Sequence, residues 1–279
     1  MAVIVAVVMT AIVGILGAGA LLLDRRPPAP AGEQNGMNRH LAVAAILWVI
    51  FTALSLAGAV AMDPFPTGAA PEAAFSDHAF RLMTYMGAPI LGLVLAGLVY
   101  SVLTFRSAGG ADAEDGPPMK GTGMVPKVWL GATTALAVTV MVSPGLTGLA
   151  EMRADRTSDM TIKMTGQRWS WTADYPGGIT SDELVLPVNK RVKFEVTAPE
   201  GDVLHSFWVP AFRNKIDAVP GMTTVTYITP NRIGDGKDDA AYRVQCAELC
   251  GLMHARMAMN VRVVDAAEYD KWLAGKVKK

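Results

Sequence analysis

The chain has 279 residues, of which 51% are hydrophobic and 18% are charged, and its formal net charge at pH 7 is zero. This apolar share is too high for an ordinary soluble protein of that length and indicates a membrane protein. The balanced net charge suggests no nucleic-acid partner.

Four stretches contain no Asp, Glu, Lys or Arg: residues 1–23, 41–62, 82–105 and 128–150. Each has about the 20 residues that a helix needs to cross a bilayer. The first stretch has the alternative of a secretory signal, but it lacks a basic start and runs directly into "DRRPP". We therefore expect four transmembrane helices, with two additional spans in 1–81 and a transmembrane hairpin in 82–150.

The basic residues of the short loops predict the orientation, because Lys and Arg beside spans tend to stay in the cytoplasm. Linkers 24–40 and 106–127 each carry three basic residues, whereas loop 63–81 carries only Arg81. Both termini should lie on the extracytoplasmic side of a bacterial plasma membrane. Residues 151–279 then form an extracytoplasmic domain long enough for its own core.

Short runs rich in Val, Thr and Ile begin after Thr157, and they alternate polar with apolar residues. Pro, Gly and Asp separate these runs, which is typical of strands in a β-sandwich or Greek-key barrel. The sequence "DAAEYDKWLAG" predicts one short helix near the end, capped by Asp265. The exported domain is thus expected to be all-β with a short terminal helix. Its strands are predicted in "MTIKM", "ELVLPV", "RVKFEVTA", "TTVTYIT" and "MNVRVV".

Both cysteines of the chain lie in "CAELCGLMHARM", residues 246–257. Outside the cytoplasm two cysteines can form a disulfide, and on cysteine count alone that reading stays open. Cys246, Cys250, His254 and Met257 are spaced by four, four and three, but Gly251 interrupts a helix and strand-like runs flank the segment. We expect a loop that wraps around a bound group between two strands.

Thiolate, imidazole and thioether form a soft ligand set that suits copper better than Mg or Ca. One copper ion needs only one cysteine, whereas two thiolates can bridge two copper ions that each require a histidine. His205 in "GDVLHSFWVP" is the only other histidine of the exported domain. A lone histidine is more often structural, but a two-copper site requires this one.

The pattern of the motif resembles subunit II of cytochrome c oxidase, which carries a binuclear copper centre called CuA. "CAELCGLMHARM" meets every fixed position, and "GQRWSWTADYP" and "DVLHSFWVPAFRNKIDAVPG" are similar to other segments of that family. The resemblance implies a cupredoxin-like domain with Cys246 and Cys250 as bridging thiolates, His205 and His254 as terminal ligands and Met257 as a weak axial ligand. It also implies coordination by the Glu248 carbonyl, with a Mg or Mn ion at the subunit I boundary through the Glu248 carboxylate.

The resemblance further implies that electrons from cytochrome c arrive at Trp169 and that Asp174 and Asp202 help that partner to dock. The alternative is that Trp169 and Trp171 only pack on the sandwich, which we expect for Trp171. Arg168 departs from the family pattern beside Trp169, so the docking face is expected to be remodelled. Pro126 replaces a glutamate near the proton-uptake entrance, which leaves the proton route open.

As a whole, the resemblance implies an electron-transfer subunit of a proton-translocating respiratory oxidase. Its partners would be membrane lipid, other oxidase subunits and a subunit I with haem and CuB, where oxygen is reduced to water. One alternative is a membrane-tethered copper chaperone, although such a protein has no need for His254 and Met257. The other alternative is the CuA subunit of a nitric oxide reductase, which these residues distinguish poorly from an oxidase.

Overall fold

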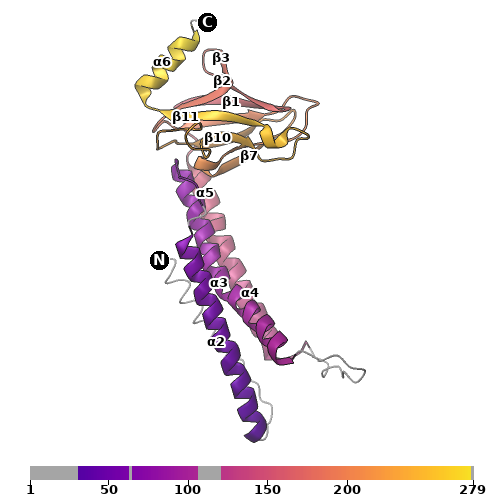
Figure 1. The fold of residues 1–279 in the computed structure, drawn as a ribbon. Helices are drawn as coiled ribbons and strands as arrows, with labels where there is room; N and C mark the ends of the chain where they lie inside the picture. Colours follow the sequence, from indigo (N-terminus) through magenta and orange to yellow (C-terminus); the bar gives the residue numbers. More distant parts are fainter. Residues whose placement is uncertain (1–30, 63–64, 106–120, 278–279) are drawn as a thin grey trace. The chain divides into compact units, whose positions relative to one another are not determined.

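The computed structural model describes residues 31–62, 65–105 and 121–277 (Figure 1). The expected span at 1–23 lies outside these residues. The chain forms two compact units. Of the described residues, the helical unit comprises 31–62, 79–105 and 121–147, and the β unit comprises 65–78 and 148–277.

Three long apolar helices match the expected spans at 41–62, 82–105 and 128–150. They are α2 (Ala31–Ala61), α3 (Pro71–Phe105) and α4 (Met124–Val140), which continues through the π-helix η1 (Met141–Leu146) into α5 (Thr147–Ala154). Their segments long and apolar enough to cross a membrane are Asn38–Ala61, Pro71–Thr104 and Met124–Ala154. Ser143 leaves helical geometry because a residue that precedes proline is pushed toward extended conformations.

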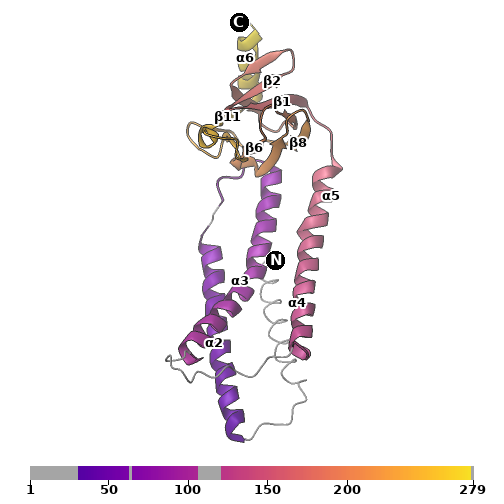
Figure 2. The same ribbon diagram turned by 90° about the vertical axis from the view of Figure 1, so that its right-hand side faces the viewer.

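Helices α2 and α3 run antiparallel and touch closely (Figure 2). The Trp48 indole donates a hydrogen bond to the Pro89 carbonyl at 2.8 Å. Gly92 lies so close to Thr52 that a Cβ atom there would be 2.4 Å from the threonine hydroxyl oxygen. The absence of a side chain at Gly92 therefore permits this approach, as small residues do at many membrane helix interfaces.

The β unit contains two sheets, and every strand predicted from the sequence is confirmed. The first sheet has the order β3-β2-β1-β5-β8, and the second has β4-β11-β10-β6-β7 with β9 paired to β11. Most neighbours are antiparallel, but β1–β5 and β4–β11 are parallel. The strands are β1 (Met160–Gln167), β2 (Ser170–Tyr175), β3 (Ile179–Ser181), β4 (Glu183–Pro187), β5 (Val192–Thr197), β6 (His205–Val209), β7 (Asn214–Ala218), β8 (Thr224–Ile228), β9 (Gly234–Asp235), β10 (Arg243–Cys246) and β11 (Ala258–Val264).

Alternating side chains from the strands form one apolar core. Strand β5 shows the pattern clearly, because Val192, Phe194 and Val196 are fully buried while the residues between them are partly exposed. Phe194 packs against Phe207 of β6 with ring centroids 5.3 Å apart, which joins the two sheets. Burial of each such side chain contributes about 1.5–3 kcal/mol.

The terminal helix α6 (Ala266–Val277) confirms the predicted helix and its cap. The Asp265 carboxylate accepts a hydrogen bond from the Glu268 N–H at 2.8 Å, which satisfies a free donor of the first turn. Trp272 of this helix packs edge-on against Tyr175, with ring centroids 5.0 Å apart. This contact therefore attaches the helix to the β unit.

The segment 64–78 belongs to the β unit, although it precedes the long part of α3. Ala69 donates to the Ala211 carbonyl at 2.8 Å, and its own carbonyl accepts from Asn231 at 2.9 Å. Arg213 pairs with Asp77 at 2.8 Å. The sequence pattern offered no sign of these contacts, because they join residues more than 130 positions apart.

Candidate metal centre

The loop between β10 and β11 carries the cysteine motif. Cys246 ends β10, His254 begins the short 3-10 helix η3 (His254–Arg256) and Met257 directly precedes β11. Gly251 has a φ of 109°, a conformation that side-chain-bearing residues rarely adopt. The loop closes on itself through a hydrogen bond from the Cys246 N–H to the Met257 carbonyl at 3.0 Å. The predicted loop between two strands is confirmed.

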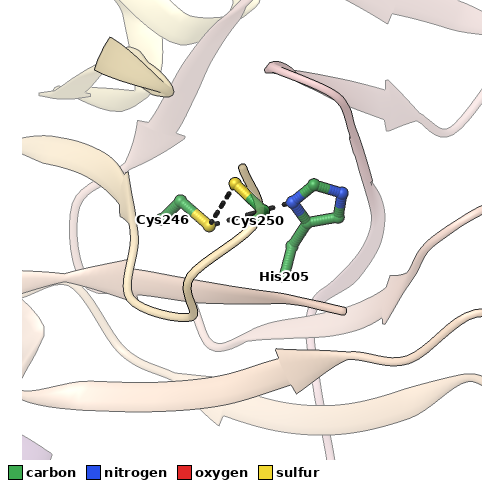
Figure 3. Close-up of side chains that lie close together, drawn as sticks. All are labelled: His205, Cys246 and Cys250. Atoms are coloured by element: carbon green, nitrogen blue, oxygen red, sulfur yellow. Dashed lines mark hydrogen bonds between the residues drawn. The ribbon is translucent and has the colours of Figure 1, made fainter. Parts of the chain in front are cut away.

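The sulfur atoms of the loop lie together, and both thiols are free and buried. The two Sγ atoms are 3.7 Å apart, and the Met257 Sδ is 3.7 Å from the Cys250 Sγ. An imidazole flanks each thiol, since His205 Nδ1 is 3.8 Å from Cys246 Sγ and His254 Nδ1 is 3.6 Å from Cys250 Sγ. Figure 3 shows His205, Cys246 and Cys250 facing one another. Their donor atoms all lie within 4.8 Å of each other.

His205 reaches the loop because it is the first residue of β6, which pairs with β10 through Cys246 and Phe207. Its side chain is fully buried, and its ring meets Trp171 edge-on at 6.2 Å between centroids. Gly166 of β1 leaves room for this contact, because a Cβ atom there would be 2.8 Å from the Trp171 ring. Trp171 is 3% exposed, so the expectation that it packs in the core is confirmed.

Burial dominates the electrostatics of these side chains. Burial, together with a smaller contribution from the nearby Cys246 thiol, raises the pKa of the Cys250 thiol to about 11. Burial also lowers the pKa of His205, although the Asp202 carboxylate opposes that change. A neutral imidazole and a protonated thiol are therefore favoured without a cation. A bound cation would reverse the balance at the thiols, because metal binding releases their protons.

Glu248 presents its backbone carbonyl to the centre, where it accepts from the Cys246 thiol at 3.2 Å. All six residues expected as ligands from the sequence therefore lie in one chain of contacts. Soft sulfur and imidazole donors gathered in a buried site fit copper. The residues present thus fit a copper centre of the expected kind.

Trp169 lies at the edge of the centre, where its indole donates to the Cys250 carbonyl at 3.0 Å. Trp169 is 38% exposed, so part of it meets solvent while the indole nitrogen contacts the cysteine loop. It precedes β2 rather than lying on it. Of the two tryptophans, the structure therefore brings only Trp169 to the surface beside the centre.

Asp202 is held in place from several sides, and its side chain is only 6% exposed. Its carboxylate accepts from the Arg168 backbone and guanidinium at 3.0 and 2.6 Å and from the Val203 N–H at 2.7 Å. It also lies 3.8 Å from His205 Nε2. Burial raises the pKa of Asp202, but these hydrogen bonds outweigh it and hold the pKa below its ordinary value.

Asp174 lies elsewhere, on β2, where it accepts from the Thr180 hydroxyl at 2.7 Å. The sequence did not reveal that Trp171 packs against the His205 ring or that Gly166 leaves room for this contact. A glycine inside a strand run was the one available signal, because it often marks a close approach by another group.

Comparison with known proteins identifies a matching family and several relatives. The family model described as cytochrome c oxidase subunit II, periplasmic domain, matches residues 178–264. An alternative cytochrome c oxidase subunit 2 of Bradyrhizobium diazoefficiens is 29% identical over 231 residues, which cover 71% of this chain and 79% of that protein. The haem-copper oxidase subunit 2 of Aeropyrum pernix is 31% identical over 218 residues, which cover 71% of this chain and 88% of that protein.

A solved structure of the periplasmic domain of subunit II of cytochrome oxidase from Bradyrhizobium japonicum is 35% identical to this chain. It matches with a TM-score of 0.40 over 44% of this chain and 96% of that chain. The Aeropyrum relative is matched over 88% of its own length. The chain belongs to the cytochrome c oxidase subunit II family.

Proposed function

We propose that this chain, as the electron-transfer subunit II of a haem-copper oxidase, accepts electrons at a binuclear copper centre in its β domain. Cys246 and Cys250 would bridge the two ions, with His205 and His254 as the terminal ligands. Met257 and the Glu248 carbonyl would complete the set. The observation that carries this proposal is the pair of buried thiols 3.7 Å apart with an imidazole beside each.

The bound copper pair would supply one-electron redox chemistry. The protein's own contribution is a rigid, buried ligand set, because strands β6, β10 and β11 hold the loop from both ends. Trp171 and Gly166 fix the His205 ring on one side, and Asp202 lies near its other nitrogen. Such supporting contacts orient ligands and tune metals.

Cytochrome c is the proposed donor, with Trp169 as the place where electrons arrive. The half-exposed ring and its hydrogen bond to the Cys250 carbonyl support this role. We also propose Asp174 and Asp202 as docking residues. The pairing of Asp202 with Arg168 weakens the negative charge that Asp202 presents to a basic partner.

Electrons would pass to haem in a subunit I that also carries CuB and reduces oxygen. Other subunits would complete a proton-translocating complex, and the Glu248 carboxylate would reach a Mg or Mn ion at the subunit I boundary. The chain would have four spans, with additional spans in 1–81, a hairpin in 82–150 and a Greek-key cupredoxin domain in 151–279 outside a bacterial plasma membrane.

Family membership supports an oxidase subunit over the copper-chaperone and nitric oxide reductase alternatives. The test is the copper content and electron paramagnetic resonance of the full-length chain in detergent. We expect two copper ions per chain that share one unpaired electron over both nuclei. A single copper ion with a mononuclear spectrum would contradict the binuclear proposal.

A further inference from the structure

A cavity of about 670 Å³ lies within the β unit, away from the metal centre. The first turns of α3 and helix α5 form one wall, and strands β5, β7 and β8 form the other. It shares no lining residue with the cysteine loop or with the residues that support His205. The proposed electron transfer therefore does not account for it.

Basic side chains dominate the lining of this cavity. Five lining residues are basic and two are acidic. The basic residues are Arg153, Arg156, Arg191, Lys193 and Lys215, and the acidic residues are Glu72 and Glu151. A concave site lined by an excess of one charge attracts ligands of the opposite charge.

Some of this charge is already balanced within the β unit. Arg191 lies 3.6 Å from the Glu72 carboxylate, and Lys193 pairs with Glu195 at 2.5 Å. Lys215 lies over the Trp208 ring, with its nitrogen 4.8 Å from the ring centroid, and it pairs with no acidic side chain among the described residues.

Arg153 and Arg156 are cavity cations whose charge no acidic side chain balances among the described residues. Both are exposed, and neither forms an ion pair with another residue in the described part of the chain. Together with Lys215 they leave three positive charges, against the single remaining acid Glu151. The net charge of the cavity is therefore suited to an anion.

Chain continuity places the cavity at the level of lipid headgroups. Helix α5 forms the carboxyl end of the candidate span Met124–Ala154, and the first turns of α3 form the amino end of Pro71–Thr104. These helix ends are where a span emerges from the hydrocarbon core. The same wall also offers apolar surface, since Leu149 and Met152 are 46% and 49% exposed beside the arginines.

We propose that this cavity binds the phosphate headgroup of an anionic glycerophospholipid. Arg153, Arg156 and Lys215 supply the positive charge, and Leu149 and Met152 supply apolar surface for the glycerol and the first acyl carbons. Guanidinium groups suit this ligand because their fork of donors matches the oxygens of a phosphate. The site would hold a lipid beside the β domain independently of copper.

The test compares lipid binding by the full-length chain and two double variants in neutral detergent, measured by native mass spectrometry. Phosphatidylglycerol and phosphatidylcholine are titrated separately, and phosphatidylglycerol is then titrated in the presence of inorganic phosphate. Arg153→Gln/Arg156→Gln removes the two free cations. Lys237→Gln/Lys271→Gln removes the same charge from exposed positions outside the cavity and serves as the control.

We expect tight binding of phosphatidylglycerol that phosphatidylcholine does not match and that inorganic phosphate at equal concentration does not displace. The arginine variant should bind it roughly 20- to 30-fold more weakly, because each cation near an anionic lipid contributes about 1 kcal/mol. The lysine variant should stay within about twofold of the wild type. The proposal would be overturned by an equal loss of phosphatidylglycerol affinity in both double variants or by equal binding of the two lipids. Displacement of bound phosphatidylglycerol by inorganic phosphate would overturn it as well.

Loss of folding in the arginine variant would be detected by circular dichroism. In that case the wild-type chain decides the question through its thermal unfolding midpoint. Phosphatidylglycerol should raise that midpoint more than phosphatidylcholine does, because a ligand that binds the folded state stabilises it. Equal shifts from the two lipids would overturn the proposal.

Discussion

The two units of the chain use apolar side chains in opposite ways. In the β unit, Leu186 and Phe207 are fully buried between the sheets. In α4 no residue is buried, and Leu130 is 67% exposed. The β unit is thus stabilised by its own core, whereas the α4 face suits contact with lipid or a neighbouring subunit. Apolar composition alone does not distinguish these situations, because both kinds of segment are rich in Leu and Val.

The metal centre depends on the β unit in a way that the helices do not share. Its ligand candidates come from β6 and from the loop between β10 and β11, which are about 40 residues apart in the chain. Disturbing that region should therefore affect metal binding and stability together. Equivalent changes in the helices should leave the centre intact.

The largest effect is expected from Cys250→Ser in the full-length chain. The change removes one of the two proposed bridges, so copper should fall from two ions per chain to at most one, with a changed paramagnetic resonance spectrum. Met253→Leu, at a partly exposed position of the same loop, is the matched control and should retain both ions. An unchanged spectrum in the serine variant would count against the binuclear centre.

A matched pair of leucine substitutions tests the contrast between the units directly. Leu186→Ala should lower the free energy of unfolding by about 2–5 kcal/mol, because it opens a cavity in a closed core. Leu130→Ala should change it by no more than about 0.5 kcal/mol in detergent. Chemical unfolding followed by tryptophan fluorescence measures both, and similar losses at the two sites would contradict the contrast.

Gly166→Ala probes the support of the centre. The added methyl group would lie 2.8 Å from the Trp171 ring and 3.3 Å from the His205 Cβ. We expect a loss of about 1–3 kcal/mol in stability and a shifted copper absorption band. Gly275→Ala in α6, where the methyl group meets no atom within 4 Å, should be neutral or slightly stabilising. An unshifted band at Gly166→Ala would show that Trp171 does not position His205.

Trp169→Ala should leave the copper spectrum and the stability close to those of the wild type, since the ring is partly exposed. Electron transfer from reduced cytochrome c should nevertheless slow, which stopped-flow absorbance measures. Trp169→Phe keeps an aromatic ring but loses the hydrogen bond to the Cys250 carbonyl, so it separates the two contributions. Unaltered rates in both variants would assign Trp169 to packing alone.

The smallest effect concerns acid stability in the copper-free chain. Burial raises the pKa of Asp202, but the hydrogen bonds from Arg168 and Val203 outweigh it and keep the pKa low in the folded state. The stabilisation is present above the ordinary carboxyl pKa of about 3.9 and is lost as pH falls through the lower folded value. Between neutral pH and about pH 3, the Asp202→Asn variant should therefore lose less free energy of unfolding than the wild type does. Asp174→Asn is the surface control, and an equal change in both would contradict this role for Asp202.

Much of the fold was predictable because its determinants are local. Charge-free stretches of about 20 residues predicted the helices, and alternating runs such as "RVKFEVTA" predicted the strands. The terminal helix was predicted from its cap at Asp265. The pairing order of the strands was not predictable, because parallel neighbours such as β1 and β5 are joined by long stretches of chain.

The chemical character of the candidate centre follows from local sequence, because the cysteine motif already contains four donors and His205 was the remaining imidazole of the exported domain. The geometry of the centre, with two thiols 3.7 Å apart and an imidazole beside each, depends instead on tertiary packing. Tertiary contacts also bring Trp169 against the loop, pair Arg168 with Asp202, and place Arg153 of α5 and the following Arg156 in one cavity with β7 and β8. These features arise from packing between distant segments, whose contacts depend on the free energy of the whole domain rather than on any local pattern.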